Sequence, residues 1–453
     1  MRLKIVLAFL IFLVSIFSIG QNLGKPFWGE HDWNGVRYGN IARNFLRYGI
    51  LDLKFAQVEN SGPLEDQQFV YYTHYPPLLP ILISLSYKIF GVSEFSTRIV
   101  PTIFTAGAIS LIFLIGSTLF SKRIGLLASL FSILIPMTLY FGKNASHEPI
   151  ALFFILLSFY GFILYKRKVM YSLALFIIGI IFAEMSAWAG YFLIPAITLV
   201  AIFKKSIKEI KFILPFWFLS IFLFLIHLGV VYLATGTSFG GGLFDALLYR
   251  SGIAINLAPE GFDLIGYLQR IRLWFFITFS ATLTIISLCW VIKGFIRKFS
   301  DEDLDIFILG LIGVIYLIVF SNAAFIHNYL LFYFLPFLTI SAASLLFSLK
   351  NINKFKNIYL IFIIVILFLV VNERRDFLIA LNNSQADKLA VDVGKAIDRD
   401  TKLEDKILIK PSSFVNSADY FLKFYSNRQL IYEGVGQSTV LVDQENRKFE
   451  IID

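Results

Sequence analysis

Long apolar runs separated by short clusters of lysine and arginine dominate this chain. A helix needs about 20 apolar residues to cross the roughly 30 Å hydrocarbon core of a bilayer. Because 57% of the 453 residues are hydrophobic and only 16% are charged, too few polar residues remain to cover a soluble protein. The sequence therefore predicts a polytopic α-helical membrane protein with about eleven transmembrane helices. The predicted spans are 4–21, 99–120, 124–141, 149–165, 169–185, 190–204, 212–234, 272–292, 304–321, 329–349 and 357–372.

The basic clusters predict how these spans are oriented. With about eleven spans, all of the clusters fall on one side, which the positive-inside rule assigns to the cytoplasm. We therefore expect a multi-pass protein of the plasma (inner) membrane with a cytoplasmic N-terminus. The formal charge of +9 arises in these loops and does not indicate a nucleic-acid partner. The clusters lie at residues 1–4, 122–123, 166–168, 204–211, 293–298 and 350–356.

Two apolar segments have alternative interpretations. Residues 4–21 follow a basic start and fit either a cleaved secretory signal or an uncleaved signal anchor. No small-residue cleavage site is obvious near Ser18 to Gly20, which favours the anchor. Pro76 to Phe90 is only about fifteen residues long and contains Lys88, so we expect an interfacial or re-entrant helix there.

The polar remainder of the chain falls on the extracytoplasmic side. It comprises a first loop at 21–98 with interfacial helices, a turn at 142–148, a loop at 235–271, and the tail. From Glu373 the composition is that of a soluble protein. We expect a transmembrane domain at 1–372 and a small extracytoplasmic α/β domain at 373–453. The pattern in the tail predicts helices at 386–397 and 418–425 and strands at 406–410, 429–432 and 439–442.

Three carboxylates lie beside span ends on the extracytoplasmic side. Glu30 and Asp32 follow the first span, and Glu148 opens the fourth. Ionisable groups at such positions are costly and usually face a cavity rather than lipid, so all three are candidate catalytic residues. Structural roles stay open as alternatives. Asp32 is placed to cap a following helix, and Glu148 is placed to interact with the dipole of its own helix.

Basic and histidine side chains on the same side are candidate ligands for a substrate, because paired N–H donors suit a phosphate. The loop at 235–271 also contains Phe239-Gly240-Gly241-Gly242, whose glycines allow the backbone to approach a ligand closely. For any single cation, an ordinary interfacial anchor is the alternative. The candidate substrate-binding residues are Arg43, His74, Lys143, His147, Arg250, Arg270 and Arg272.

The order of these motifs resembles that of the GT-C membrane glycosyltransferases, specifically the superfamily of protein O-mannosyltransferases and lipid A aminoarabinose transferases. An acidic residue follows the first span, then come Ala42-Arg43-Asn44, a His-x-Pro-Pro-Leu stretch at 74–78, and an acidic residue opening the fourth span. The resemblance covers residues 1 to about 350. It implies the GT-C fold and transfer of a sugar from a polyprenyl-phosphate donor to an extracytoplasmic protein, lipid or glycan.

The resemblance also implies roles for the carboxylates. Asp32 matches the catalytic carboxylate of the first loop, and Glu148 matches the second acidic position. Because this chain has Glu30-His31-Asp32 where the mannosyltransferases have an Asp-Glu pair, Glu30 remains an alternative base. A carboxylate would accept the proton of the acceptor hydroxyl, and cations would hold the donor phosphate. Inversion at the anomeric centre is implied, and a divalent metal between Asp32 and Glu148 stays open.

A lipid or sugar flippase or transporter is the main alternative function, with a non-catalytic membrane scaffold as the third. Transporters tend to carry ionisable groups near mid-membrane and to contain internal repeats. Here the polar groups lie at one face and no repeat is visible. This pattern favours the transferase. The single cysteine, Cys289, lies within a predicted span and excludes an intrachain disulfide and a cysteine-based metal site.

Overall fold

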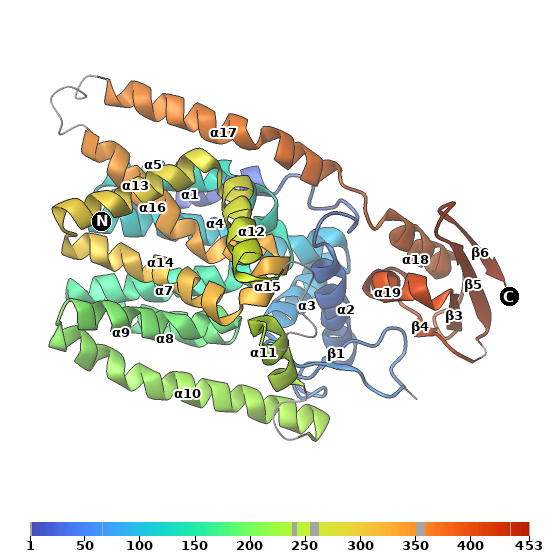
Figure 1. Cartoon of the computed structure of the whole chain (residues 1–453). Helices are drawn as coiled ribbons and strands as arrows, with labels where there is room; N and C mark the ends of the chain where they lie inside the picture. The colour runs from blue at the N-terminus through green and yellow to red at the C-terminus, as the bar shows by residue number, and fades with distance from the viewer. Residues whose placement is uncertain are drawn as a thin grey trace.

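A bundle of apolar helices with a small α/β unit at one end forms the structure (Figure 1). The computed structural model describes residues 2–65, 67–237, 242–253, 262–349, 358–434 and 436–452. The N-terminus lies at the end of the bundle that is farther from the α/β unit, and α17 leads along the bundle into that unit. The predicted basic cluster at 350–356 and residues 239–241 of the glycine run lie outside the described residues.

The bundle and the first loop contain the following elements. The α-helices are α1 Arg2–Ile19, α2 Trp33–Tyr48, α3 Leu78–Phe90, α4 Glu94–Leu119, α5 Lys122–Leu134, α6 Pro136–Leu139, α7 Glu148–Lys166, α8 Ser172–Glu184, α9 Leu193–Phe203, α10 Ile207–Thr235, α11 Leu243–Ser251, α12 Leu264–Phe279, α13 Ala281–Arg297, α14 Asp301–Val319, α15 Ser321–Ile326, α16 Leu335–Ser348 and α17 Tyr359–Asn383. The 3-10 helices include η1 Phe141–Lys143, η2 Trp188–Phe192 and η4 Asn328–Phe334, and the short strands are β1 Gln57–Val58 and β2 Tyr71–Tyr72.

Each predicted span coincides with a helix or helix pair, but fewer of them meet the length and composition expected of a membrane span. Among the described residues four do so, Glu94–Leu119, Glu148–Lys166, Ile207–Thr235 and Asn328–Ser348, or up to six if each of two bent pairs is one span. Others, such as the 13-residue α8, are shorter than a full crossing needs. The figure of eleven spans therefore stays a prediction. Within the segment Pro76 to Phe90, the 13 residues Leu78–Phe90 form α3, which is too short to cross a bilayer as a single span.

The predicted span at 272–292 is not one straight helix. It is divided at Ser280 into α12 and α13, which are bent by 111° relative to each other. Ser280 has a φ of 81°, in the left-handed region, and its hydroxyl accepts the backbone N–H of Leu283. A residue in this conformation caps the second helix instead of continuing the first, which the apolar pattern of the sequence did not indicate.

Basic clusters meet at the end of the bundle away from the α/β unit. Lys4 and Arg167 both donate hydrogen bonds to carbonyls in the last turn of α4. Lys166 and Lys204 both donate to the carboxylate of Asp305, at 2.7 and 2.6 Å. These contacts bring three of the clusters together at one end, as the sequence predicted for 1–4, 166–168 and 204–211.

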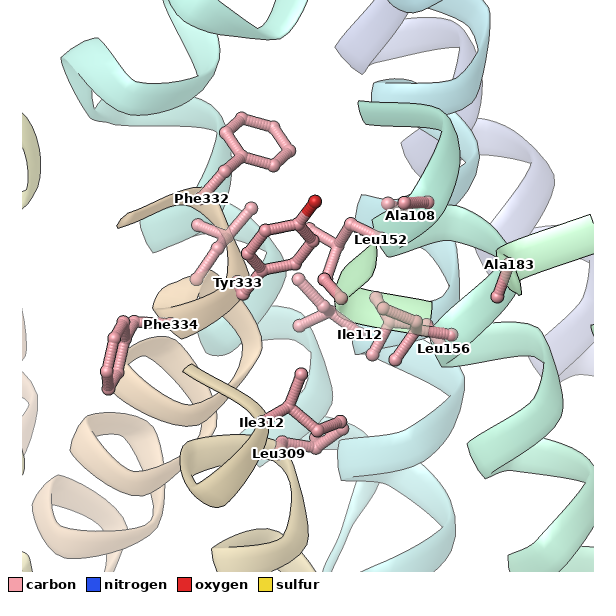
Figure 2. Close-up of a cluster of buried hydrophobic side chains, with 14 of the residues drawn as sticks. Ala108, Ile112, Leu152, Leu156, Ala183, Leu309, Ile312, Phe332, Tyr333 and Phe334 are labelled. Carbon is pink, nitrogen blue, oxygen red and sulfur yellow. The ribbon is translucent and has the colours of Figure 1, made fainter. Parts of the chain in front are cut away.

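The core of the bundle is built where helices cross near its centre. Figure 2 shows side chains from α4, α7, α8, α14 and η4 pointing toward one another, among them Ile112, Leu156, Ile312 and Tyr333. All four are at most 1% exposed. Because these helices are apolar around much of their circumference, they can bury one face here while others face lipid. Packing in this core fixes the relative positions of the helices whose ends contain the polar residues described below.

The C-terminal unit is a four-stranded sheet with two helices, α18 Lys388–Asp400 and α19 Ser412–Ser426. The strand order is β4-β3-β5-β6, with β3 parallel to both β4 and β5 and β6 antiparallel to β5. The expected helices and strands are confirmed, and the last strand was not predicted. The strands are β3 Lys406–Lys410, β4 Gln429–Ile431, β5 Ser438–Asp443 and β6 Lys448–Ile452.

The first loop completes the core of this C-terminal unit. Phe27 and Val36 are fully buried in one hydrophobic cluster with residues of α18, α19 and the sheet. In addition, the hydroxyl of Tyr425 donates to the carboxylate of Glu94, the first residue of α4. A domain of about 80 residues can bury only a small hydrophobic core by itself. Phe27 and Val36 of the first loop enlarge the core of the C-terminal unit. Helix α17 runs unbroken across the predicted boundary at residue 373.

Candidate functional site

A polar cavity of about 140 Å³ lies at the end of the bundle nearest the C-terminal unit. Its walls come from α2, the loop before α3, the start of α7, α11 and the segment from α15 to η4. Because these elements are far apart in the sequence, only the folded bundle assembles the cavity. The side chains that bring charge or hydrogen-bonding groups to it include Asn34, Arg37, Tyr38, Tyr72, His74, Tyr75, Ser146, His147, Glu148, Tyr249, Arg250, His327 and Tyr329.

Arg37 enters the polar cavity from α2. It forms an ion pair with Glu59, and its guanidinium lies between the rings of Tyr72 and Tyr420, 4.2 and 4.6 Å from their centroids. Although burial alone would lower it, the carboxylate of Glu59 keeps the pKa of Arg37 above its ordinary value. Aromatic rings on both faces hold the planar group in one orientation while its charge persists. Because Tyr420 belongs to α19, the C-terminal unit helps to position a cation of this cavity.

Arg250 enters the same cavity from α11. Its Nη1 donates to the hydroxyl of Tyr75 at 2.6 Å, and its guanidinium lies 4.6 Å from the centroid of that ring. His74 is adjacent to Tyr75 and lines the cavity too. Burial, and then the positive charges of Arg250 and Arg37, lowers the pKa of His74 to about 4. His74 is therefore neutral near pH 7, and the two arginines supply the positive charge.

His147 and Glu148 line the polar cavity at the start of α7. Both are buried, with 2% and 3% exposure. The His147 ring stacks on Tyr75 at 4.3 Å and meets the ring of Tyr38 edge-on at 4.7 Å. The structure thus brings together four residues that the sequence singled out, namely His74, His147, Glu148 and Arg250.

Asp32 lines a second, smaller cavity of about 30 Å³, here called the Asp32 cavity. Its Oδ1 accepts a hydrogen bond from Arg98 at 3.1 Å, and its Oδ2 accepts the backbone N–H of Gly29 at 2.8 Å. Lys143 lines this cavity as well. Asp32 precedes α2 but makes no side-chain capping bond to it. Asp32 and Glu148, which the sequence predicts on the same side of the membrane, therefore line different cavities.

Glu30 and His31 connect the two cavities. The backbone carbonyl of Glu30 accepts from Tyr140, which lines the Asp32 cavity, and the His31 ring lies 4.8 Å from that of Tyr329, which lines the polar cavity. The Glu30 carboxylate accepts from Asn328 at 2.9 Å and lies 3.4 Å from His31 Nε2. Although burial alone would raise it, these two neighbours hold the pKa of Glu30 below its ordinary value.

An apolar cavity of about 220 Å³ adjoins the polar cavity. The two share His74, Ala246 and Arg250 in their walls. The rest of the apolar cavity is formed by α10, η2, α11 and Phe320, and Trp188 there donates its indole N–H to the carbonyl of His74. A polar chamber and an apolar one thus meet at Arg250, which suits a ligand with a charged head and an apolar tail.

Three of the predicted substrate-binding arginines lie elsewhere. Arg43 donates to the carbonyl of Phe424 at 2.8 Å and so contacts the C-terminal unit. Arg270 is exposed, with its guanidinium 4.1 Å from the Phe325 ring. Arg272 is also exposed. None of the three lines the polar, Asp32 or apolar cavities among the described residues, and their role in binding stays a prediction.

A metal shared by Asp32 and Glu148 does not fit this arrangement. The two carboxylates line different cavities, and Asp32 is already paired with Arg98. Among the described residues, no group of three or more His, Cys, Asp or Glu side chains is placed to hold a metal ion.

The sequence did not single out several residues of the site. Arg98 forms an ion pair with Asp32, 66 positions away in the sequence. The sequence indicated only that Arg98 lies at the end of the first loop. Arg37 was not selected as a candidate. Tyr38, Tyr72, Tyr75 and Tyr329 were not selected either, because no motif in the sequence distinguishes them from the other tyrosines. The Pro-Pro pair at 76–77 that follows Tyr75 was the available clue to a constrained backbone at that point.

Asp387 gives a pH-dependent test of the contact between the Asp32 cavity and the C-terminal unit. Its backbone N–H donates to the carbonyl of Trp28. Burial, and then the negative charge of Asp32, raises the pKa of Asp387 from 3.8 to about 6. The folded protein then binds this proton more tightly than the unfolded chain does, so this group lowers stability progressively as the pH rises from about 4 to about 6.

Asp387→Asn is therefore expected to raise the Tm of the purified protein at about pH 7.5 and to leave it nearly unchanged at about pH 4. Asp392→Asn, five residues further along in α18, is the charge-matched control. An equal gain in Tm at both pH values would contradict the prediction, as would an equal gain in the control.

Comparisons with known proteins agree with the resemblance seen in the sequence. The family described as dolichyl-phosphate-mannose-protein mannosyltransferase matches residues 74–233, less than half of the chain. No curated protein matches the sequence. The fold is similar to that of the archaeal oligosaccharyltransferase AglB from Archaeoglobus fulgidus, solved with an inhibitory peptide and a dolichol-phosphate, with a TM-score of 0.61 and 14% identity. That match covers 94% of this chain and 64% of AglB, so the chain spans less than two thirds of AglB.

The fold is also similar to that of ArnT from Cupriavidus metallidurans. The structure of ArnT bound to undecaprenyl phosphate matches with a TM-score of 0.58 and 13% identity over 98% of this chain and 86% of ArnT. The apo structure matches with a TM-score of 0.62 and 12% identity over 98% of this chain and 93% of ArnT. The chain thus has the fold of the GT-C membrane glycosyltransferases, and the resemblance is confirmed at that level.

Proposed function

We propose that the protein is an integral-membrane glycosyltransferase that moves a sugar from a polyprenyl-phosphate donor to an extracytoplasmic acceptor. The observation that carries the proposal is the junction of the polar and apolar cavities at His74, Ala246 and Arg250. A lipid-linked sugar has a charged phosphate and an isoprenoid tail, and the two chambers match these parts. Dolichol-phosphate and undecaprenyl phosphate are present in structures of AglB and ArnT, respectively, which have the same fold.

In this proposal Arg37 and Arg250 hold the donor phosphate. Both guanidiniums are positioned on tyrosine rings at the polar cavity, and guanidinium forks match phosphate oxygens. Neutral His74 is placed to add a hydrogen bond without a further charge. The isoprenoid tail extends from Arg250 along the apolar cavity between α10 and α11. Glu148 accepts hydrogen bonds from hydroxyls of the donor sugar.

Asp32 serves as the base in this proposal. The acceptor hydroxyl gives its proton to the Asp32 carboxylate as its oxygen forms a bond to the anomeric carbon. The bond from that carbon to the phosphate oxygen breaks, and polyprenyl phosphate leaves with the electron pair. Arg37 and Arg250 stabilise the charge that develops on the leaving phosphate. A direct displacement of this kind inverts the anomeric centre.

The segment that contains Glu30 and His31 must move for the two substrates to meet. It contacts the walls of both cavities, with Asp32 on one side. His31 has a φ of 61°, in the left-handed region, and strain of this kind is common at sites that rearrange. We propose that binding of both substrates opens the segment and brings the acceptor oxygen to the sugar.

The membrane placement completes the proposal. Basic loops gather at the end of the bundle away from the C-terminal unit, which favours that end as the cytoplasmic one. The protein would then lie in the plasma (inner) membrane with its N-terminus in the cytoplasm. The C-terminal unit and all three cavities would be extracytoplasmic, and the acceptor would be a protein, lipid or glycan of that compartment.

Membranes that contain the protein, supplied with radiolabelled polyprenyl-phosphate sugars, test the proposal against a flippase. We expect label to pass from the lipid donor to a product that no longer extracts with the donor. Membranes without the protein are the control. Movement of the labelled lipid across the bilayer with no transfer of its sugar would favour the flippase and contradict the proposal.

A further inference from the structure

The Asp32 cavity contains more positive charge than its one carboxylate requires. Arg98 already pairs with Asp32 at 3.1 Å. Lys25 and Lys143 line the same cavity and add two further cations. Because partly buried charges of one sign repel each other, a surplus of this kind indicates a counter-charge that the cavity receives from outside.

The two lysines keep donors available for such a group. Lys143 Nζ donates to the carbonyl of Gln21 at 2.7 Å, and Lys25 Nζ donates to the carbonyl of Asn382. An ammonium group has three donors, and among the described residues each of these lysines uses one. The carbonyls thus hold the ammonium groups in place without consuming their hydrogen-bonding capacity.

Neutral polar groups in the same wall also lack partners. Asn144 lines the cavity and is 5% exposed, yet neither its amide nitrogen nor its amide oxygen has a hydrogen-bond partner among the described residues. The buried indole N–H of Trp28, another lining residue, is likewise without one. Buried polar groups are nearly always satisfied, so unpaired ones in a cavity wall point to a bound ligand.

We propose that the Asp32 cavity binds an oxyanion, a phosphate or a carboxylate, that the acceptor carries close to its reacting hydroxyl. This inference rests on the proposed function, because it takes Asp32 as the base for that hydroxyl. Lys25, Lys143, Asn144 and Trp28 donate to the oxyanion. Asp32 accepts from the neighbouring hydroxyl. The substrate class is thus a hydroxylated, anionic acceptor, distinct from the donor lipid at Arg250.

The size and position of the cavity agree with this assignment. About 30 Å³ holds a group of a few atoms and excludes a whole sugar. Leu381 and Asn382, at the end of α17, complete the wall. The acceptor therefore approaches between the first loop and the C-terminal unit, while the donor lipid approaches from the bundle side between α10 and α11.

The test measures binding without catalysis, in the full-length purified protein. The probes are glycerol 3-phosphate, glycerate and glycerol, and the readout is the Tm. A ligand that binds only the folded protein raises the Tm in a saturable way. We expect saturable shifts with at least one of the two anions and none with glycerol. Lys143→Met and Lys25→Met should each weaken anion binding at least tenfold, and Asp32→Asn should strengthen it by removing a like charge.

Two control variants locate the site. Lys208→Met removes an exposed lysine of α10 at the other end of the bundle and should leave anion binding unchanged. The lysine substitutions are also measured in the Arg250→Gln background, so that binding of glycerol 3-phosphate at the polar and apolar cavities does not contribute. The inference is overturned if glycerol acts like the anions, if neither anion shifts the Tm, if binding survives both lysine substitutions, or if Arg250→Gln abolishes it.

The same assay separates this inference from the proposed function. If sugar transfer is observed but neither anion binds at Lys25 and Lys143, the inference fails and the transferase stands. If the anions bind there but no sugar transfer is found, the proposed function fails and the oxyanion site stands without its assignment to an acceptor.

Discussion

Asp32→Asn is expected to lower kcat for sugar transfer by about 10²- to 10⁴-fold, the range typical of losing a positioned general base. The amide has nearly the size of the carboxylate but does not take up a proton. Its oxygen can still accept one of the two hydrogen bonds that Arg98 and Gly29 now donate to Asp32. The expected change is therefore chemical, with protein level and donor binding close to those of the wild type. It is measured as transfer from radiolabelled polyprenyl-phosphate sugar at matched amounts of protein.

Glu30→Gln and Glu148→Gln are the matched variants, because each also converts one carboxylate to an amide. Glu30 is held by His31 and Asn328 and is expected to affect the rate less than Asp32 does. Glu148 lines the donor cavity, so its loss is expected to act mainly on KM for the donor. If Glu148→Gln abolished transfer while Asp32→Asn retained it, the roles of the two carboxylates would have to be exchanged.

The elements of the fold could be predicted largely from the sequence because they depend on local signals. Apolar runs indicated the helices at the predicted spans, and the short apolar run between Lys406 and Lys410 indicated β3. Helix α11 was not predicted, because its segment was expected to be a loop. The break at Ser280 was missed because it depends on a single backbone conformation inside an apolar run. Strand β6 was not predicted, although Phe449 and Ile451 alternate with Lys448 and Glu450; these two side chains are only half-buried against the core of the C-terminal unit.

The candidate site was predicted less completely, since it depends on which distant side chains meet. His74, His147, Glu148 and Arg250 come from three separate regions of the chain and do line one cavity. Arg43 was selected for its motif but contacts the C-terminal unit, one turn and a half along α2 from Arg37. Val36 of α2 packs in the hydrophobic cluster of the C-terminal unit, a contact between segments more than 350 residues apart that the local pattern of α2 does not indicate.

The separation of Asp32 from Glu148 has the same physical origin. Asp32 follows the first predicted span and Glu148 begins the fourth. The sequence therefore predicts both carboxylates on the same side of the membrane. Arg98 then pairs with Asp32 and turns it toward Lys143, whereas Glu148 faces Arg250 and the tyrosines. The ion pair spans 66 positions, and its formation could not be read from either residue alone.

Arg250→Gln is expected to lower kcat/KM for the polyprenyl-phosphate sugar by about 30- to 700-fold. Removing one partner of a buried, hydrogen-bonded charge pair costs about 2–4 kcal/mol, and every 1.4 kcal/mol is about tenfold. Among the described residues, Arg250 is the one cation in the walls of both the polar and the apolar cavity, so it lies where the phosphate would join the isoprenoid tail. Because the phosphate gains charge as it leaves, the loss should be seen in kcat as well as in KM.

Arg270→Gln provides the matched control for this prediction, since Arg270 lies on the following helix but is exposed on the Phe325 ring. It is expected to change kcat/KM less than about threefold, in line with the small worth of exposed charges. Arg250→Lys keeps the positive charge but loses the planar guanidinium, whose N–H groups can reach both Tyr75 and a phosphate. Its kcat/KM should therefore lie between the values of the wild type and of Arg250→Gln. Equal losses in Arg250→Gln and Arg270→Gln would mean that positive charge near the membrane surface, and not a phosphate contact at the cavity junction, supports the reaction.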